Sequence, residues 1–161
     1  MSASRESRRT AVVTGSTSGI GLAIAERLAS GGFNIVVNSY TDAEADHAIA
    51  AGLARRYGVE AIYVRADMSK PAECRALVEA SASRFGSVDI LVNNAGIQYV
   101  APVEEFPVER WDAIIAINLS SAFHTAAAAI PGMREAGWGR IVNIASAHGL
   151  RASPNKSAYV A

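Results

Sequence analysis

Two hydroxyl-bearing side chains near the end of this sequence could take part in proton transfer. Ser146 is followed thirteen residues later by Tyr159, in the stretch "SAYVA" that ends the 161-residue chain. A tyrosine acts as a base near neutral pH only with a cation beside it, because its ordinary pKa is about 10. No lysine or arginine follows Tyr159 in this chain. Taken alone, Ser146 is more typical of a helix cap or a loop hydroxyl.

A glycine-rich stretch near the start of the chain points to anion binding. "TGSTSGIG" lies between a Val-rich run and an amphipathic segment. Its first glycine permits a tight turn, and the other two let the backbone come close to a pyrophosphate and to a sheet. The free amides and positive dipole of a helix start favour an anion there. The stretch therefore predicts a dinucleotide site made by Thr14, Gly15, Ser16, Thr17, Ser18, Gly19, Ile20 and Gly21.

Composition narrows the class of protein. Half of the residues are hydrophobic, 19% are charged, and Lys+Arg and Asp+Glu both number 15. The net charge of zero gives no single-sign field for nucleic acid or an anionic membrane, and no run approaches the roughly 20 apolar residues that span a bilayer. The single Cys74 excludes an internal disulfide, and no His/Cys/Asp cluster has metal-ligand spacing. We expect a cytoplasmic protein without a metal, a nucleic-acid partner or a membrane partner.

Alternating strand-like and helix-like segments indicate an α/β fold. Val- and Ile-rich runs typical of strands covered on both faces lie at 10–14, 33–38, 61–66, 88–93 and 140–146. Helical patterns lie at 19–30, 42–57, 70–85 and 108–133. Strands joined by helical crossovers predict a Rossmann-type, doubly wound parallel sheet over residues 10–161. Residues 1–9, which carry three arginines and no apolar run, are expected to form a disordered tail.

The segment 108–133 is apolar around most of its circumference, which predicts burial against the sheet and against a second surface. Asn118 lies on the same helical stripe as Ile114 and Ala122, one turn to either side. We therefore expect Asn118 to be a buried amide that needs hydrogen-bond partners.

Further polar signals fall at the carboxyl ends of the predicted strands, where such sheets bind ligands. Ser146 ends the fifth strand. The expected cofactor site is completed by residues that follow the third and fourth strands, which are Asp67, Met68, Asn94, Ala95 and Gly96. Asp67 could also cap the next helix.

The end of the second strand indicates which dinucleotide is bound. An acidic residue there favours the free 2′-hydroxyl of NAD, whereas an arginine accommodates the 2′-phosphate of NADP. The stretch "NSYTD" contains Asp42 and no basic residue, and the glycine loop has none either. A 2′-phosphate would lack a cation, so NAD is the expected cofactor.

Together these motifs resemble those of the short-chain dehydrogenase/reductases, over about residues 8–161. The resemblance rests on "TGSTSGIG", "NNAG", Asn118, and Ser146 with Tyr159. It implies that Asn118 holds a water in a proton relay and that Ser146 bonds the reacting oxygen. Tyr159 would take the hydroxyl proton while a hydride passes to the nicotinamide. The family's lysine, four residues after the tyrosine, would fall two residues beyond this chain.

Longer stretches resemble bacterial members of the family that oxidise D-3-hydroxybutyrate to acetoacetate. These are "NNAGIQ", "PVEEFPVERWDAIIAINLSSAFHT", "GRIVNIASAHGL" and "NKSAYVA". The resemblance implies a small 3-hydroxy acid as substrate, with its carboxylate held by Gln98, His148 and Lys156, beside Ser146 and Tyr159. Otherwise His148 packs within a loop and Lys156 is a solvated helix-start lysine.

The resemblance also implies a longer, homotetrameric protein. We expect this chain to be a C-terminally truncated piece, poorly stable and nearly inactive alone, because the family's next helix packs beside 108–133 and forms subunit contacts. Two other functions stay open. One is that of an NADPH-dependent 3-oxoacyl reductase of the same family, and the other is that of a non-catalytic NAD-binding remnant.

Overall fold

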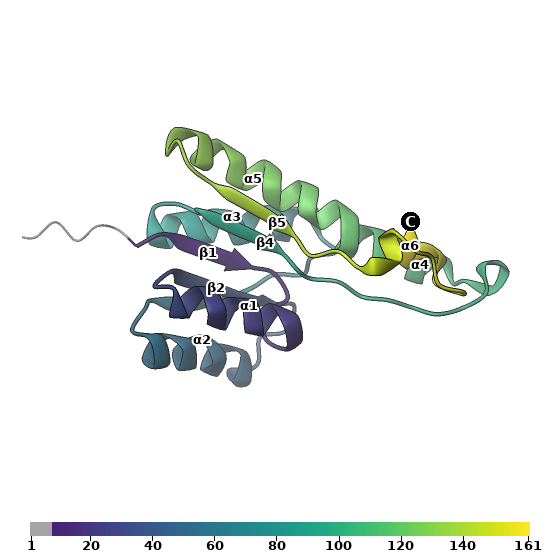
Figure 1. The fold of residues 1–161 in the computed structure, drawn as a ribbon, viewed down its shortest axis with the longest axis horizontal. Coiled ribbons are helices and arrows are strands. Elements are labelled where there is room, and N and C mark those ends of the chain that lie inside the picture. Colours follow the sequence, from purple (N-terminus) through teal and green to yellow (C-terminus); the bar gives the residue numbers. More distant parts are fainter. Residues whose placement is uncertain (1–7) are drawn as a thin grey trace, which may run out of the picture.

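Five parallel strands form the centre of the protein (Figure 1). The structure, a computed structural model, describes residues 8–161. The strand order is β3-β2-β1-β4-β5, which confirms the predicted doubly wound sheet. The strands are β1 (Thr10–Val13), β2 (Asn34–Ser39), β3 (Ala61–Arg65), β4 (Ile90–Asn93) and β5 (Arg140–Asn143). Every pairing is parallel, as helical crossovers require.

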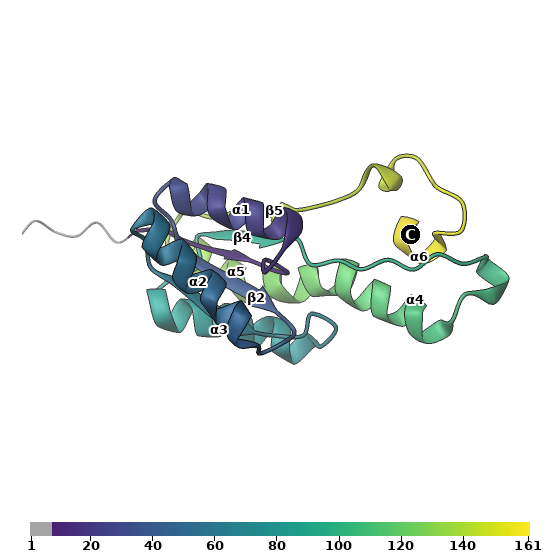
Figure 2. The ribbon, with the colours of Figure 1, turned by 90° about the horizontal axis from the view of Figure 1, so that it is seen from below.

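Two helical layers cover the sheet (Figures 1 and 2). Helices α1 (Gly19–Ser30) and α2 (Glu44–Tyr57) pack on one face, and α3 (Pro71–Phe85) and α5 (Ser121–Glu135) pack on the other. Successive residues of β1 point to opposite faces, so Ala11 and Val13 join the α1/α2 core while Val12 joins the α3/α5 core. All three are fully buried, which explains why the central strands read as unbroken apolar runs.

The predicted helix 108–133 forms as one continuous helical run, Val108–Glu135, that contains a π turn. The structure has α4 (Val108–Ile115), a π-helical turn at Ala116–Ser120, and then α5. The turn contains Asn118, whose side-chain amide is bonded to another loop. Single π turns inside α-helices are frequent at functional sites.

The fifth strand is shorter than predicted and lies at the edge of the sheet. It ends at Asn143 rather than at 146, and among the described residues it pairs only with β4. All four of its residues are exposed, including Val142 at 44%. The chain then forms a short 3₁₀ turn (Ala147–Gly149) and the four-residue helix α6 (Ser157–Val160). Together with a 3₁₀ turn at Val103–Glu105 and α4, α6 extends beyond the strand ends (Figure 2).

The expected N-terminal tail lies mostly outside the described residues, which begin at Arg8. Arg8 donates a hydrogen bond to the carbonyl oxygen of Gly58, and the guanidinium of Arg9 lies 3.8 Å from the ring centre of Trp138. Both arginines, which were expected in the tail, therefore contact the domain.

One helical run contradicts the expectation that no segment is long enough to span a bilayer. Val108–Glu135 is 28 residues long and, by length and composition alone, apolar enough to cross a membrane. Its inner face packs on α3 and on the sheet, with Thr125 and Ala129 buried. Since the core helices of soluble proteins pass the same test, this run is weak evidence for a membrane span.

The single cysteine provides a test of the α3/α5 core. Burial raises the pKa of the Cys74 thiol to about 11, and the residue is 0% exposed. At pH 8 only about one thiol in a thousand would be ionised, and the thiolate is the reactive form. We predict that a thiol reagent labels the folded protein at least ~100-fold more slowly than the same protein in denaturant. Equal rates would show that α3 does not seal this core.

Candidate active site

The glycine loop after β1 is held against the loop after β4 by close backbone packing. Gly15 has a φ of 60°, which favours glycine, and a Cβ there would lie 2.9 Å from the Cα of Ala95. A Cβ on Gly21 would collide with the carbonyl oxygen of Gly15. Gly15 thus lets the loop meet the loop after β4, and Gly21 lets the start of α1 meet the glycine loop.

Thr14 links the same two loops by hydrogen bonds. Its hydroxyl oxygen accepts bonds from the backbone amides of Asn94 and Ala95, each 3.0 Å long. The side chain of Asn94 donates to the carbonyl oxygens of Thr14 and Gly15 at 2.9 and 3.0 Å. Four of the expected cofactor residues, Thr14, Gly15, Asn94 and Ala95, therefore form one small network at the carboxyl ends of β1 and β4.

The outer part of the glycine loop has the geometry of an anion site. Gly19 has a φ of 54°, and nothing lies within 4 Å of the place where its Cβ would be. Ser18, Gly19 and Ile20 are exposed, and Ser18 makes no side-chain cap to the amides of the first turn of α1. These amides, at the positive end of the helix dipole, suit a pyrophosphate. Thr17 is half-buried, whereas Ser16 is buried and its hydroxyl donates to the carbonyl oxygen of Val13.

Asn38, the first residue of the stretch "NSYTD", organises the glycine loop. It is 1% exposed, and its side-chain oxygen accepts a 3.1 Å bond from the amide of Gly15. Its side-chain nitrogen donates to the carbonyl oxygens of Val64 and Ala66, both at 3.1 Å. An asparagine ending an otherwise Val/Ile strand was the available signal, because a buried amide needs partners.

The two expected cofactor residues after β3 differ in their surroundings. Asp67 is partly exposed and accepts bonds from both the amide and the hydroxyl of Ser69, at 2.9 and 2.7 Å. The hydrogen bond from the Ser69 hydroxyl lowers the pKa of Asp67, and the charge of Lys70 adds to the effect. Met68, in contrast, is 5% exposed and its side chain packs in the α3/α5 core. Its side chain is therefore not at the edge where a cofactor would bind.

The polar groups at the end of β2 offer no cation for a 2′-phosphate. Asp42 pairs with His47 at 2.8 Å, and Asp46 accepts a bond from the hydroxyl of Thr41. The structure places one basic residue near the end of β2 that the sequence did not suggest. Arg65 of β3 lies beside Ser39 of β2 in the register of the two strands. Its guanidinium is engaged by the carboxylate of Glu73 at 3.1 Å. Arg65 thus shares the carboxylate of Glu73 with Lys70.

Asn118 is less buried than expected and is anchored by backbone. It is partly exposed, and its side-chain oxygen accepts a bond from the amide of Ile97 while its nitrogen donates to the carbonyl oxygen of Ile97, both 2.9 Å. The reciprocal pair fixes the loop after β4 to the π turn between α4 and α5. Gly96, in that loop, lies against the Asn118 amide.

Four expected residues gather between the end of β5 and α6. The hydroxyl of Ser146 accepts a 3.2 Å bond from the backbone amide of His148. The imidazole of His148 lies 3.4 Å from the ammonium nitrogen of Lys156 and 6.2 Å, between ring centres, from Tyr159. Lys156 and Tyr159 share one turn, because the amide of Tyr159 donates to the carbonyl oxygen of Lys156. A hydroxyl, a phenol, an imidazole and an ammonium group can together bind an anionic hydroxy acid and move its proton.

The expected residue Gln98 lies one position after Ile97 and is exposed. Within residues 8–161 its side chain makes no hydrogen bond, and the structure does not join it to His148 or Lys156. The loop that carries it does reach the other loop, since the amide of Ala101 donates to the carbonyl oxygen of Asn155.

A polar network that the sequence did not reveal ties α5 to the strand ends. The hydroxyl of Thr125 donates to the side-chain oxygen of Asn93 at 2.7 Å, and the side-chain nitrogen of Asn93 donates to the side chain of Asn143 at 2.9 Å. Thr125 is 0% exposed. Sequence periodicity placed Thr125 inside a helix but could not show which strand it meets.

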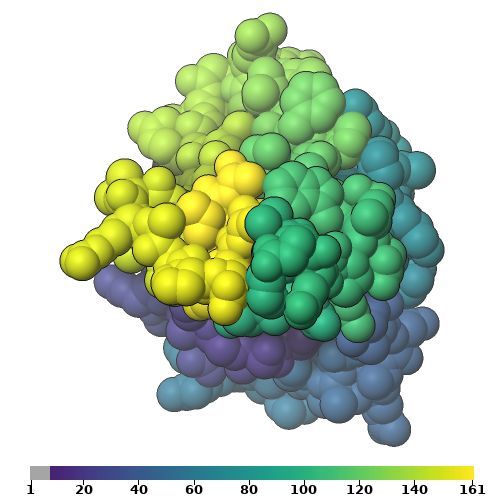
Figure 3. All heavy atoms as spheres, turned by 90° about the vertical axis from the view of Figure 1, so that its right-hand side faces the viewer, coloured from purple at the N-terminus to yellow at the C-terminus, as the bar shows by residue number. Residues whose placement is uncertain are grey.

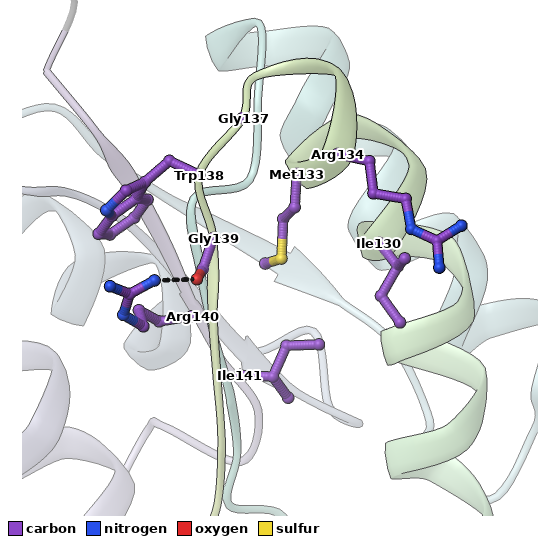
Figure 4. Close-up of a pocket in the computed structure, with 8 residues that line it drawn as sticks. All are labelled: Ile130, Met133, Arg134, Gly137, Trp138, Gly139, Arg140 and Ile141. Carbon is purple, nitrogen blue, oxygen red and sulfur yellow. Dashed lines mark hydrogen bonds between the residues drawn. The ribbon is translucent and has the colours of Figure 1, made fainter.

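A groove away from these residues lies at the other end of β5 (Figure 4). It is lined by residues from the end of α5 and the start of β5, among them Met133, Arg134 and Ile141. The guanidinium groups of Arg9 and Arg140 lie 3.8 and 4.9 Å from the ring centre of Trp138. None of the expected site residues lines this groove, so we assign the active site to the carboxyl ends of the strands.

Two curated relatives of this chain are D-beta-hydroxybutyrate dehydrogenases. A D-beta-hydroxybutyrate dehydrogenase of Cupriavidus necator is 60% identical over 153 residues, and one of Rhizobium meliloti is 56% identical over 153 residues. These matches cover 95% of this chain, but 58% and 59% of the relatives. The chain thus spans somewhat more than half the length of the relatives it matches.

Solved structures show the same architecture. An alcohol dehydrogenase from the archaeon Thermococcus sibiricus, complexed with 5-hydroxy-NADP, superposes with a TM-score of 0.89 at 31% identity. The match covers 95% of this chain and 64% of that one. The family described as "short chain dehydrogenase" matches residues 9–161. With its glycine loop, its parallel sheet, and Ser146 and Tyr159 in the segment after β5, this chain belongs to the short-chain dehydrogenase family.

Proposed function

We propose that the native-length protein oxidises D-3-hydroxybutyrate to acetoacetate with NAD. The observation that carries this proposal is the cluster of Ser146, His148, Lys156 and Tyr159, in a chain 60% identical to a D-beta-hydroxybutyrate dehydrogenase. The cluster offers a cation for a carboxylate beside hydroxyl groups for an alcohol. A small 3-hydroxy acid has a carboxylate and an alcohol, with one carbon between the carboxylate and the carbon that bears the hydroxyl group.

The residues present fit a dinucleotide. The tight approach of Gly15 to Ala95 and the open position at Gly19 leave backbone amides, not side chains, to face a pyrophosphate. When bound, the nicotinamide would supply the hydride acceptor. Thr14, Asn38 and Asn94 would hold the glycine loop in shape.

The protein's own groups would then handle the proton and the carboxylate. Tyr159 takes the hydroxyl proton of the substrate, and the hydroxyl of Ser146 holds the reacting oxygen. Lys156, supported by His148 at 3.4 Å, pairs with the carboxylate and sets the orientation of the substrate. Asn118, fixed by both backbone groups of Ile97, holds a water that carries the proton onward. Gln98, on the same loop as Ile97, would add a further donor for the carboxylate.

The cytoplasmic location stays a prediction.

The carboxylate site has a direct test. We predict that Lys156→Ala raises the KM for D-3-hydroxybutyrate by ~10- to 100-fold, since a hydrogen bond to a charged group contributes about 1.5–3 kcal/mol. The kcat should fall less than ~3-fold, because the lost contact binds substrate and transition state alike. Steady-state kinetics with NAD would measure both.

A matched substrate provides the control. The methyl ester of the substrate has no carboxylate, so the parent protein and Lys156→Ala should have similar KM values for it. A parent protein that prefers esters or thioesters to the free acid would contradict the proposal and favour the 3-oxoacyl reductase alternative. NAD binding without any turnover by the native-length protein would favour the non-catalytic alternative.

The preference for NAD is also a proposal, supported by the acidic loop after β2 and by the Arg65–Glu73 pair. We predict that the parent protein has a kcat/KM at least ~10-fold higher with NAD than with NADP. Ser39→Arg should raise kcat/KM with NADP ~10-fold or more, because a guanidinium binds phosphate through two hydrogen bonds. Ser39→Gln, with a long uncharged side chain, should bring no such gain. A parent protein that uses both cofactors equally would refute the preference.

We also propose that the native-length protein is a homotetramer associating through the outer face of α4 and α5. Leu119 and Phe123 lie one turn apart on that face and are 62% and 65% exposed, which is unusual for large apolar side chains. We predict that Phe123→Arg shifts the protein to smaller species in sedimentation velocity. Tyr40→Arg changes a residue that is 70% exposed on the loop after β2, and it should leave the tetramer intact. A monomeric parent protein would disprove the assembly.

A further inference from the structure

Asn155 has an unusual backbone conformation. Among the described residues it is the one non-glycine residue with a positive φ, at 60°. Asparagine tolerates this left-handed region better than most residues, and alanine or β-branched residues tolerate it poorly. The residue is exposed and lies in the loop between the 3₁₀ turn at Ala147–Gly149 and α6. Such conformations persist only where surrounding contacts hold them.

The contact that holds Asn155 is a hydrogen bond to another loop. Its carbonyl oxygen accepts a 2.9 Å bond from the backbone amide of Ala101, which lies 54 positions earlier in the chain. Figure 3 shows the two loops side by side, with the C-terminal segment in yellow and the loop after β4 in teal green. A groove of about 580 Å³ runs between them and is lined by Ala101, Pro102, Asn155 and Lys156, among others.

The bond joins the two parts of the expected carboxylate site. Ala101 is three residues after Gln98, and Asn155 immediately precedes Lys156. Lys156 is the N-cap residue that immediately precedes α6, and its ammonium nitrogen lies 3.4 Å from the imidazole of His148. The backbone conformation of Asn155 sets the direction of the chain at Lys156. It therefore determines whether the ammonium group of Lys156 lies next to the imidazole of His148.

We propose that Asn155 is a positioning residue for the substrate carboxylate. Its left-handed backbone and its bond to Ala101 hold Lys156 next to His148. This inference rests on the proposed function, since it assigns Asn155 a role in binding the same acid. Asn155 itself need not touch the substrate.

The test compares two substitutions in the native-length protein. Asn155→Ala disfavours the left-handed backbone, so it should raise the KM for D-3-hydroxybutyrate ~5- to 10-fold while kcat and the affinity for NAD stay within ~2-fold of the parent protein. Asn155→Gly retains the backbone conformation without the side chain, so its KM should stay within ~2-fold of the parent value. Hydrogen exchange at the Ala101 amide should quicken in the alanine variant and not in the glycine variant.

A double mutant separates positioning from general damage. If Asn155 acts through Lys156, Asn155→Ala should add no further rise in KM once Lys156 is replaced by alanine, whereas independent effects would multiply. A folded Asn155→Ala variant with the parent's KM would overturn this inference, and so would rises in KM that multiply in the double mutant. Either result would leave the proposed function standing. A parent protein that does not turn over small 3-hydroxy acids would overturn the proposed function, and this inference with it.

Discussion

The close approach of two backbones at the carboxyl ends of β1 and β4 is the constraint on which the rest of the site depends. A single methyl group on Gly15 would press on Ala95, so the two loops can meet only with glycine at that position. Thr14 and Asn94 then fasten the loops to each other, and Asn38 fastens them to β2 and β3. Because these groups are buried and bonded on both sides, the loop that would face a pyrophosphate has little freedom to move.

The two halves of the site are built differently. The expected cofactor half rests on buried strands and on hydrogen bonds that cross the sheet. The expected substrate half lies on exposed loops joined by a few contacts, chiefly Asn118 to Ile97, Asn155 to Ala101 and Lys156 to His148. Loops positioned by a rigid scaffold can change without loss of the fold. Such a division suits a family that keeps one cofactor scaffold and varies its substrates.

The long helical segment has two roles on its two sides. Thr125 holds its inner side to Asn93 at the end of β4, and Asn118 holds its π turn to the loop after β4. Its outer side exposes Leu119 and Phe123 in a surface that no described part of the chain covers. A helix placed so firmly on one side can present a well-defined apolar surface on the other.

Much of this protein could be predicted from the sequence because its signals are local. The apolar run of β1, the glycines after it and the alternation of strand and helix predicted the parallel sheet and the place of Gly15, Gly19 and Gly21. The tertiary structure decided what depends on residues far apart in the chain. It inserted a π turn around Asn118 in the predicted helix 108–133, ended β5 at Asn143, buried Met68 in the core and brought Arg65 to Ser39 and Glu73. Periodicity reports which face a residue takes on its own element, whereas the partner on that face is chosen by packing between elements.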